Sequence, residues 1–149
     1  MQISKHSTLT EILEESTKSI SFEDRVKDFK YFYDNFDFFK KYIDLCFFEE
    51  NNFKDFENFE FSTKFKPLDK SKLLTYSRDV ILNYLPKLSD DSSMKINTKY
   101  SLFSSLLEEV AGEDINLLIG MIKGKYEGNS KINKLFLSKV FIEKKLNGV

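Results

Sequence analysis

The chain has 149 residues, the size of one domain, and a chain of that length buries roughly 70% of its unfolded surface. With 41% hydrophobic and 32% charged residues, it is too apolar for intrinsic disorder and too evenly charged for a membrane span. Its 23 basic and 24 acidic residues leave a net charge of -1, so any interface for nucleic acid would have to be local.

Three short helices are predicted in the first third of the chain. Thr8 and Glu11 form a T-x-x-E capping box, which starts a helix over residues 9–17. Ser21 is suited to cap a second helix and Asn35 a third. The apolar residues of these two helices recur at spacings of three and four, as on a buried helix face: Phe22, Val26, Phe29 and Tyr33, then Phe36, Phe39, Ile43 and either Cys46 or Phe47.

The stretch from 49 to 67 has no comparable stripe. Its phenylalanines are spaced three, three, two and four residues apart, with charged residues between them. A helix face would repeat at three or four throughout. We therefore expect an irregular connector that is pinned by its aromatic side chains.

Four more helices are predicted in the rest of the chain. Asp69 is placed to cap the first of them. Pro86 cannot donate a helical hydrogen bond and is expected to close that helix. A polar loop follows at 89–93, and Asn97 or Thr98 then begins the next helix.

Glycines and acids mark the ends of the last helices. Gly112 is suited to a left-handed cap, and Glu113 and Asp114 are expected to open the following helix, where the helix dipole is positive. After a glycine-bounded turn at 124–128, Ser130 is the expected cap of the final helix.

Together, the seven segments predict an all-α fold. We expect residues 1–149 to form one compact domain of about six to seven short helices with an irregular Phe-rich connector. Internal repeats and long linkers are absent from the sequence. The loop at 89–93 nevertheless offers a boundary between two packed halves, 1–88 and 94–149.

Residue types that serve catalysis and ligand binding are scarce. His6 is the only histidine and lies in a polar N-terminal segment that is expected to fray. Cys46 is the only cysteine, which excludes an intrachain disulfide and a thiolate metal cluster and favours a reducing compartment. Glycine-rich phosphate loops are absent. We expect no catalytic residue, metal or cofactor, and only a carboxylate magnesium site, with Asp34 and Asp37 as candidates, stays open.

Phenylalanines give the first candidate surface. Thirteen of the sixteen fall between 22 and 65, and those on helix faces are expected in the core. The rings without a helical pattern either fold back over the core or are presented to a partner. They are Phe53, Phe56, Phe59, Phe61 and Phe65.

Lysines give the second candidate surface. Four of them lie close together in the sequence, and Glu127 is the only acidic residue between them: Lys123, Lys125, Lys131 and Lys134. A local basic patch of this kind is the form that a nucleic-acid interface would take here. The competing interpretation is an ordinary solvated face, because runs of charge usually lie on the surface.

Three sequence motifs carry a resemblance to a protein family. Leu102-Phe103-Ser104-Ser105-Leu106-Leu107-Glu108 is followed by Glu113-Asp114 and by Leu117-Leu118-Ile119-Gly120-Met121-Ile122-Lys123-Gly124-Lys125. In this order the motifs are similar to a family of small proteins of T-even-type tailed phages, marine and cyanobacterial myoviruses in particular. The chain departs from the family at Val140-Phe141-Ile142, where the family tends to have alanine, phenylalanine and proline. The resemblance implies a phage protein in an infected bacterium and brings no activity or catalytic residues.

These observations favour a non-enzymatic accessory protein that acts as a protein-interaction module on host or viral machinery. Its partner would bind the phenylalanines of the connector or the lysine surface. The alternatives are a nucleic-acid-binding accessory protein and a structural virion component. Because no apolar run has the length of a signal peptide or a membrane span, we expect no membrane partner and a cytoplasmic location in the infected host.

Overall fold

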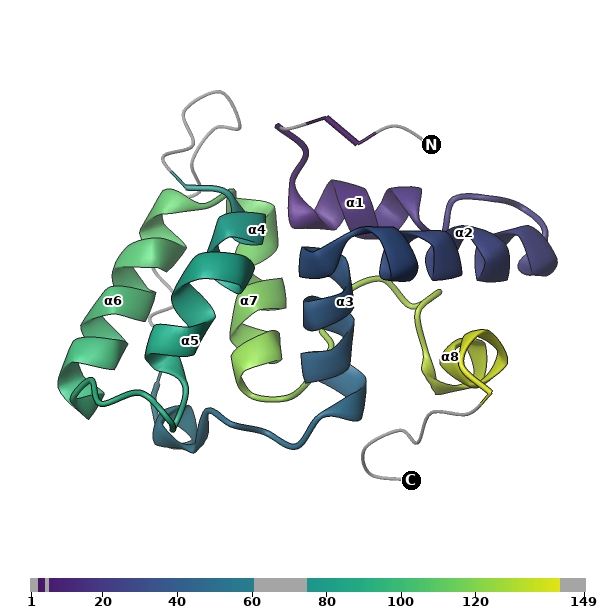
Figure 1. The fold of residues 1–149 in the computed structure, drawn as a ribbon. Coiled ribbons are helices and arrows are strands. Elements are labelled where there is room, and N and C mark those ends of the chain that lie inside the picture. Colours follow the sequence, from purple (N-terminus) through teal and green to yellow (C-terminus); the bar gives the residue numbers. More distant parts are fainter. Residues whose placement is uncertain (1–2, 5, 61–74, 143–149) are drawn as a thin grey trace.

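Helices are the only regular elements in the computed structural model, which describes residues 3–4, 6–60 and 75–142 (Figure 1). The α-helices are α1 (Leu9–Glu15), α2 (Phe22–Asn35), α3 (Asp37–Ile43), α4 (Ser77–Asp79), α5 (Leu85–Leu88), α6 (Ile96–Glu109), α7 (Ile115–Ile122) and α8 (Lys134–Val140). They are joined by the π-helical turns η1 (Asp44–Phe48) and η4 (Val80–Tyr84) and by the 3-10 turns η2 (Lys54–Phe56) and η5 (Gly112–Asp114). Over the described residues, the predicted all-α bundle of short helices is confirmed.

The predicted caps at Thr8 and Ser21 are confirmed, and those at Asn35 and Ser130 are wrong. Thr8 forms the complete capping box with Glu11, and the Ser21 hydroxyl accepts the Asp24 N–H at the start of α2. Asn35 instead ends α2, where its side-chain amide donates to the Tyr31 carbonyl at 2.8 Å. The cap of α8 is Asn133 in place of Ser130, because the Asn133 side-chain oxygen accepts the Phe136 N–H at 2.9 Å. Helix α6 begins at Ile96, before the predicted Asn97 or Thr98, and ends at Glu109, before the predicted cap Gly112.

The helical path through Pro86 differs from the prediction that this proline closes a helix. Pro86 lies in the first turn of α5, where a missing N–H is tolerated. The π-helical turn η4 comes immediately before it, and the Leu85 N–H reaches back to the Val80 carbonyl. The widened turn lets the chain continue to Leu88. The predicted start of this helix at Asp69 lies outside the described residues.

One cluster of buried side chains forms the core, and it extends from Leu9 in α1 to Phe141 after α8. Helix α8 packs on α2, and α7 packs on η1, so the two expected halves contribute to the same cluster. Aromatic edges meet across this boundary: the Phe29 ring centroid lies 5.3 Å from that of Phe136, and the Phe48 centroid lies 5.3 Å from that of Phe141. The loop at 89–93 therefore does not separate two cores.

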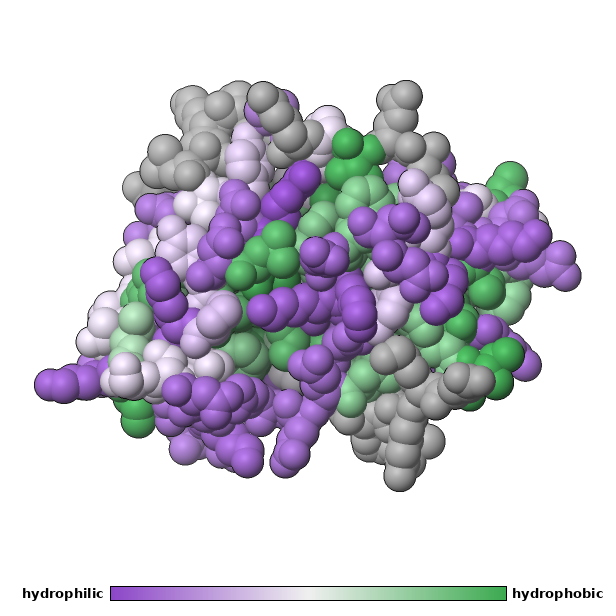
Figure 2. All heavy atoms as spheres, in the orientation of Figure 1, coloured by the Kyte–Doolittle hydropathy of each residue, from purple (hydrophilic) through white to green (hydrophobic). Residues whose placement is uncertain are grey.

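Polar side chains cover most of the face seen in Figure 2, with hydrophobic atoms in strips between them. Large apolar side chains that remain exposed are distributed over several elements: Ile20, Phe22, Tyr31, Leu82, Ile96, Leu135 and Ile142. Among the described helices, none has both the length and the apolar character that a bilayer-spanning segment requires.

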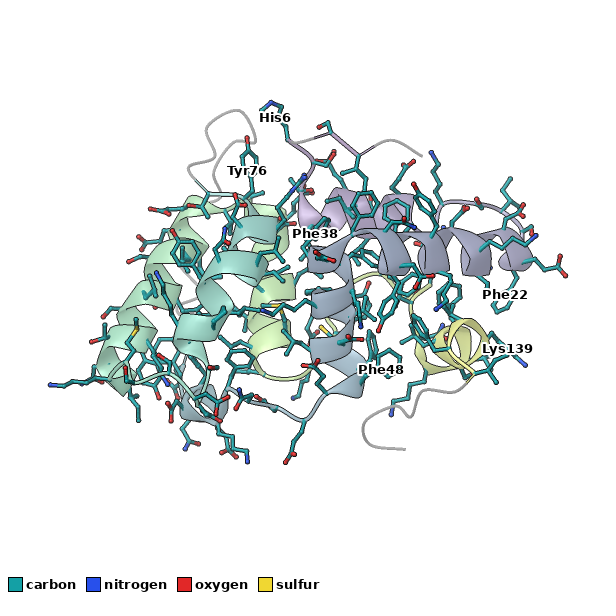
Figure 3. All side chains as sticks on the ribbon, in the orientation of Figure 1. His6, Phe22, Phe38, Phe48, Tyr76 and Lys139 are labelled. Atoms are coloured by element: carbon teal, nitrogen blue, oxygen red, sulfur yellow. The ribbon has the colours of Figure 1, made fainter. Side chains whose placement is uncertain are left out.

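The N-terminal segment is held against α4 by side chains from both sides. His6 and Tyr76 point toward each other (Figure 3), with 2.7 Å between His6 Nδ1 and the Tyr76 hydroxyl. Arg78 donates from its guanidinium to the backbone carbonyls of Ser4 and Ser7. These contacts bring the start of α1 next to the start of α4.

Beneath this contact lies the carboxylate of Asp114, which is only 1% exposed. It accepts the backbone N–H groups of Leu9 and Thr10 at 3.0 and 2.9 Å, and the hydroxyls of Thr10 and Ser77 at 2.8 and 2.6 Å. The sequence assigns Asp114 to the start of its own helix, but the side chain makes no capping bond there. It satisfies the N-terminal donors of α1 instead, which ties α1, α4 and η5 together.

We predict that Asp114→Ala lowers the free energy of unfolding by about 3 kcal/mol, because one buried and one partly buried N–H group and two hydroxyls lose their acceptor. Denaturant unfolding followed by circular dichroism measures this change. Glu108→Ala removes an exposed carboxylate from α6 and serves as the matched control, with an expected change below about 0.5 kcal/mol. Equal effects of the two substitutions would contradict the assigned role.

Candidate interaction surface

The connector folds back onto the core over its described part, residues 49–60. Phe53 and Phe56 are buried, and the Phe56 ring lies 5.5 Å from Phe103 of α6. Of the two alternatives that the sequence leaves open for these two rings, the structure has them folded back over the core. Phe59 is partly buried and stacks on Tyr100 with 4.2 Å between ring centroids, while Phe61 and Phe65 lie outside the described residues.

Lys99 and Tyr100 of α6 hold the connector in this position. Lys99 is 1% exposed, and its ammonium donates to the Asp55 carboxylate at 2.8 Å and to the Ser89 carbonyl at 2.7 Å. The Tyr100 hydroxyl donates to the backbone carbonyl of Asp55. A buried ammonium must be paired, so this arrangement fixes the place of Asp55 relative to α6.

The loop after α5 holds the same stretch from the other side. The Asp90 carboxylate accepts the backbone N–H groups of Lys54 and Asp55 at 3.1 and 3.3 Å. In return, the Asp90 N–H donates to the Asn52 carbonyl at 2.8 Å, and the Asn52 amide donates to Asp91 at 2.9 Å. The sequence predicts a loop at 89–93, and in the structure that loop anchors the connector.

A tight turn joins α7 to α8, and we call residues 123–131 the α7–α8 turn. Its backbone returns close to α7, where the Lys125 N–H donates to the Gly120 carbonyl at 2.8 Å. Gly124 has a φ of 73°, which makes it the left-handed residue that the sequence assigns to Gly112; no other described glycine has a positive φ. The Tyr126 ring points inward, with its centroid 5.3 Å from that of Phe47.

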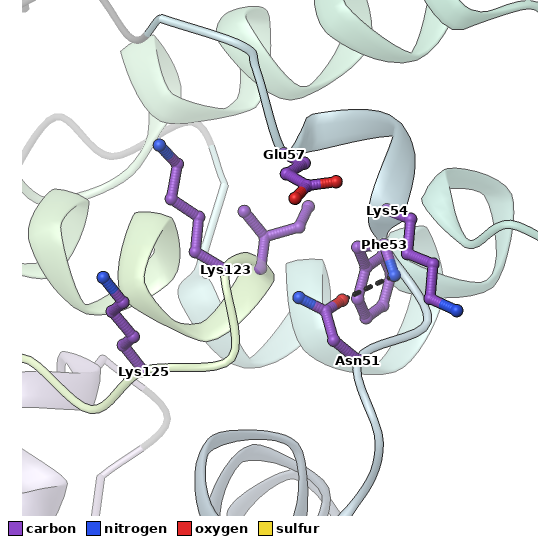
Figure 4. Close-up of a pocket in the computed structure, with 7 residues that line it drawn as sticks. Asn51, Phe53, Lys54, Glu57, Lys123 and Lys125 are labelled. Atoms are coloured by element: carbon purple, nitrogen blue, oxygen red, sulfur yellow. Dashed lines mark hydrogen bonds between the residues drawn. The ribbon is translucent and has the colours of Figure 1, made fainter.

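The connector and the α7–α8 turn enclose a hollow of about 510 Å³, which we call the basic hollow (Figure 4). Three lysines and one glutamate line it together with an amide and two apolar side chains: Asn51, Phe53, Lys54, Glu57, Ile122, Lys123 and Lys125. Phe53 and Ile122 are buried and form its apolar part, whereas Lys54, Glu57 and Lys125 are exposed. An anionic group is the ligand that this set of side chains favours.

A second hollow, of about 320 Å³, adjoins the next residues of the turn, and we call it the acidic hollow. Its lining comes from α1, from the start of α7 and from the turn: Thr10, Leu13, Glu14, Glu113, Asn116, Leu117, Glu127, Gly128 and Asn129. Three of these residues are glutamates, and none of the described lining residues is a lysine or an arginine. The local charge is thus opposite to that of the basic hollow.

Farther along the turn lies a hollow of about 360 Å³ with charges of both signs, which we call the mixed hollow. It shares Glu14 and Asn129 with the acidic hollow and adds Thr17, Lys18 and Lys131. The ammoniums here have protein partners, since Lys18 pairs with Glu15 at 2.7 Å and Lys131 lies 3.3 Å from the Thr17 carbonyl.

The four lysines of the second candidate surface are therefore distributed over different parts of the structure. Lys123 and Lys125 line the basic hollow, Lys131 lines the mixed hollow, and Lys134 is an exposed residue at the start of α8. Lys54 joins the basic hollow from the connector and was missed in the sequence. In the sequence, the only indication that Lys54 belongs to this site is its position next to Phe53. That indication is weak, because it does not show which distant lysines lie nearby in the fold.

The residue types that hold metal ions are dispersed over the described residues. No group of three or more histidine, cysteine, aspartate or glutamate side chains there is arranged to hold a metal ion. Asp34 forms a surface ion pair with Lys30 at 3.4 Å. Cys46 is buried, and burial raises the pKa of its thiol to about 12. A search for similar proteins gave no match among protein-family models, curated proteins or solved structures.

The Cys46 thiol should not react with iodoacetamide at about pH 8 in the native protein, because the thiolate is the reactive form and burial suppresses it. Mass spectrometry of the native and the denatured chain measures the labelling. Ser105→Cys places a thiol on the exposed face of α6 and should be labelled under the same conditions.

The raised pKa of Cys46 also makes the stability depend on pH. A cysteine in the unfolded chain has a pKa of about 8.5. The contribution of the Cys46 thiol to the free energy of unfolding therefore falls as the pH rises from that value toward about 12.

Gly120→Ala should lower the free energy of unfolding by about 1–3 kcal/mol, although alanine favours a helix. An added Cβ would lie 2.8 Å from Cγ of Glu127 and 2.9 Å from the Lys125 carbonyl oxygen, so the backbone of the turn would have to move. Ser101→Ala, at an exposed position of α6, is the control and should have little effect. Denaturant unfolding measures both, and a stabilised Gly120→Ala variant would contradict the packing described for the turn.

Proposed function

We propose that this chain is a non-enzymatic protein-interaction module that binds its partner at the α7–α8 turn. The observation that carries the proposal is the pair of hollows of opposite charge that follow one another along this turn. The basic hollow contains Lys123 and Lys125, and Glu127 of the acidic hollow comes two positions later. The charge of this surface changes from positive to negative over two residues. Such a surface is complementary to a partner that carries a negative and a positive group close together.

Nucleic acid is the weaker candidate partner for this surface. A phosphate backbone carries one sign of charge along its whole length, and its affinity comes from neutralisation by lysine and arginine. The glutamates at positions 14, 113 and 127 would repel the backbone next to the lysines that attract it. A protein segment can place a carboxylate and an ammonium a few residues apart, so it avoids this conflict.

The elements around the two hollows support the proposal because they are held by contacts within the protein. The connector is anchored by Lys99 and Asp90, and α1 is anchored by Asp114. Walls that are fixed before binding lose less conformational entropy when a partner arrives. We extend the proposal to host or viral machinery in an infected bacterium on the resemblance to the phage family alone.

A photoreactive amino acid at position 125 tests the proposal. In a lysate of cells that naturally make this chain, position 125 should crosslink to a discrete protein, whereas the same group at the exposed position 108 of α6 should not. Lys54→Glu should reduce the crosslink about threefold or more, because it places a negative charge in the basic hollow. Lys87→Glu, an equal charge change on α5, is the control.

Nuclease treatment separates the two partner classes. A protein partner leaves the crosslink at position 125 unchanged, whereas a nucleic-acid partner loses it and shows binding that weakens steeply with salt. The proposal is wrong if the crosslink requires nucleic acid, or if positions 108 and 125 give the same products.

A further inference from the structure

Two hollows of opposite charge lie side by side along the chain, and their spacing limits what can fill both. Lys125 lines the basic hollow and Glu127 the acidic one. Two peptide steps separate them, so their Cα atoms lie at most about 7 Å apart. The residue between them, Tyr126, is turned toward Phe47, which packs against the core, and we call the backbone of the turn at this point the ridge.

The side chains around the hollows define complementary chemistry on each side of this ridge. On one side, three lysines at positions 54, 123 and 125 outnumber the one glutamate, Glu57, around an apolar part formed by Phe53 and Ile122. On the other side, Glu14, Glu113 and Glu127 stand beside the amides of Asn116 and Asn129. Carboxylates are favoured in the first hollow and ammonium or guanidinium groups in the second.

Resting on the proposed function, we propose that the partner binds through one extended segment in which an acidic and a basic residue lie within about two to four positions of each other. At about 3.3 Å per residue, two positions span about 7 Å, which equals the greatest separation of the Lys125 and Glu127 Cα atoms, and up to four positions allow for the side chains that reach past the turn. The acidic side chain enters the basic hollow, and the basic side chain enters the acidic hollow. Because the two hollows differ in sign, the segment binds in one direction only.

Labelled synthetic peptides test this charge order directly by fluorescence anisotropy with the full chain. The dipolar probe has an acidic pair, a short glycine-serine spacer and a basic pair. The comparison probes are an all-acidic peptide and a peptide with the dipolar blocks separated by a spacer of about twelve residues, too long to hold both blocks at the ridge. We expect the compact dipolar probe to bind about tenfold more tightly than either of these.

Charge reversal of the acidic hollow provides the second measurement. The double variant Glu14→Lys and Glu127→Lys should weaken binding of the dipolar probe about tenfold and strengthen binding of the all-acidic probe. Glu113 is left unchanged because it accepts a hydrogen bond from Thr8. Glu23→Lys with Glu108→Lys makes the same change in net charge at exposed positions of α2 and α6, and it should not alter the preference.

Two results would overturn this inference. If the all-acidic probe binds as tightly as the dipolar probe, and the double variant does not affect the latter, only the basic hollow takes part; the proposed function then stands without the charge order. If no probe binds, the inference also fails. The proposed function is decided independently by the crosslinks from position 125, which use none of these peptides.

Discussion

The Asp114 carboxylate joins segments of the chain that are more than a hundred positions apart in the sequence. Its bonds to the first N–H groups of α1 place that helix beside η5 and the start of α7. Thr10 and Glu14 of α1 and Asn116 of α7 then become neighbours in the acidic hollow. A helix of seven residues is marginal by itself, so α1 depends on this acceptor for both its stability and its place.

Lys99 has a comparable role for the other hollow. Its buried ammonium holds Asp55, and thereby fixes η2 and the adjoining Glu57, so that Lys54 and Glu57 line the basic hollow. Desolvation of a charge is expensive, and apolar packing often stabilises a core as well as a buried ion pair does. The buried groups of Asp114 and Lys99 instead favour one arrangement of the segments that contact them, because an arrangement that removes those contacts leaves a buried charge unpaired.

Local signals predicted a large part of the fold. The Thr8 capping box and the Ser21 cap involve atoms within three residues, so the sequence carried all the information that they require. Pro86 shows where a local rule fails, because the π-helical turn before it accommodates the missing donor. Asn35 and Asn133 show that an asparagine near a helix boundary can serve either end.

Only part of the candidate site could be predicted from the sequence. Lys123 and Lys125 were identified as basic, but nothing local indicated that Lys54 would join them or that Glu127 would meet Glu14 and Glu113. Such groupings arise from contacts between distant segments. For the same reason Asp114 was assigned to its own helix, whereas its partners lie in α1 and α4.

The shape of the α7–α8 turn rests on residues other than those that give it charge. Gly120 allows the close approach, Gly124 allows the reversal, and Tyr126 anchors the ridge in the core. Lys125 and Glu14 are exposed, and the charged end of Glu127 can be exchanged while its Cβ and Cγ keep their place beside Gly120. Under the proposed function, single substitutions at these positions would change the charge offered to a partner while the scaffold of the turn stays the same.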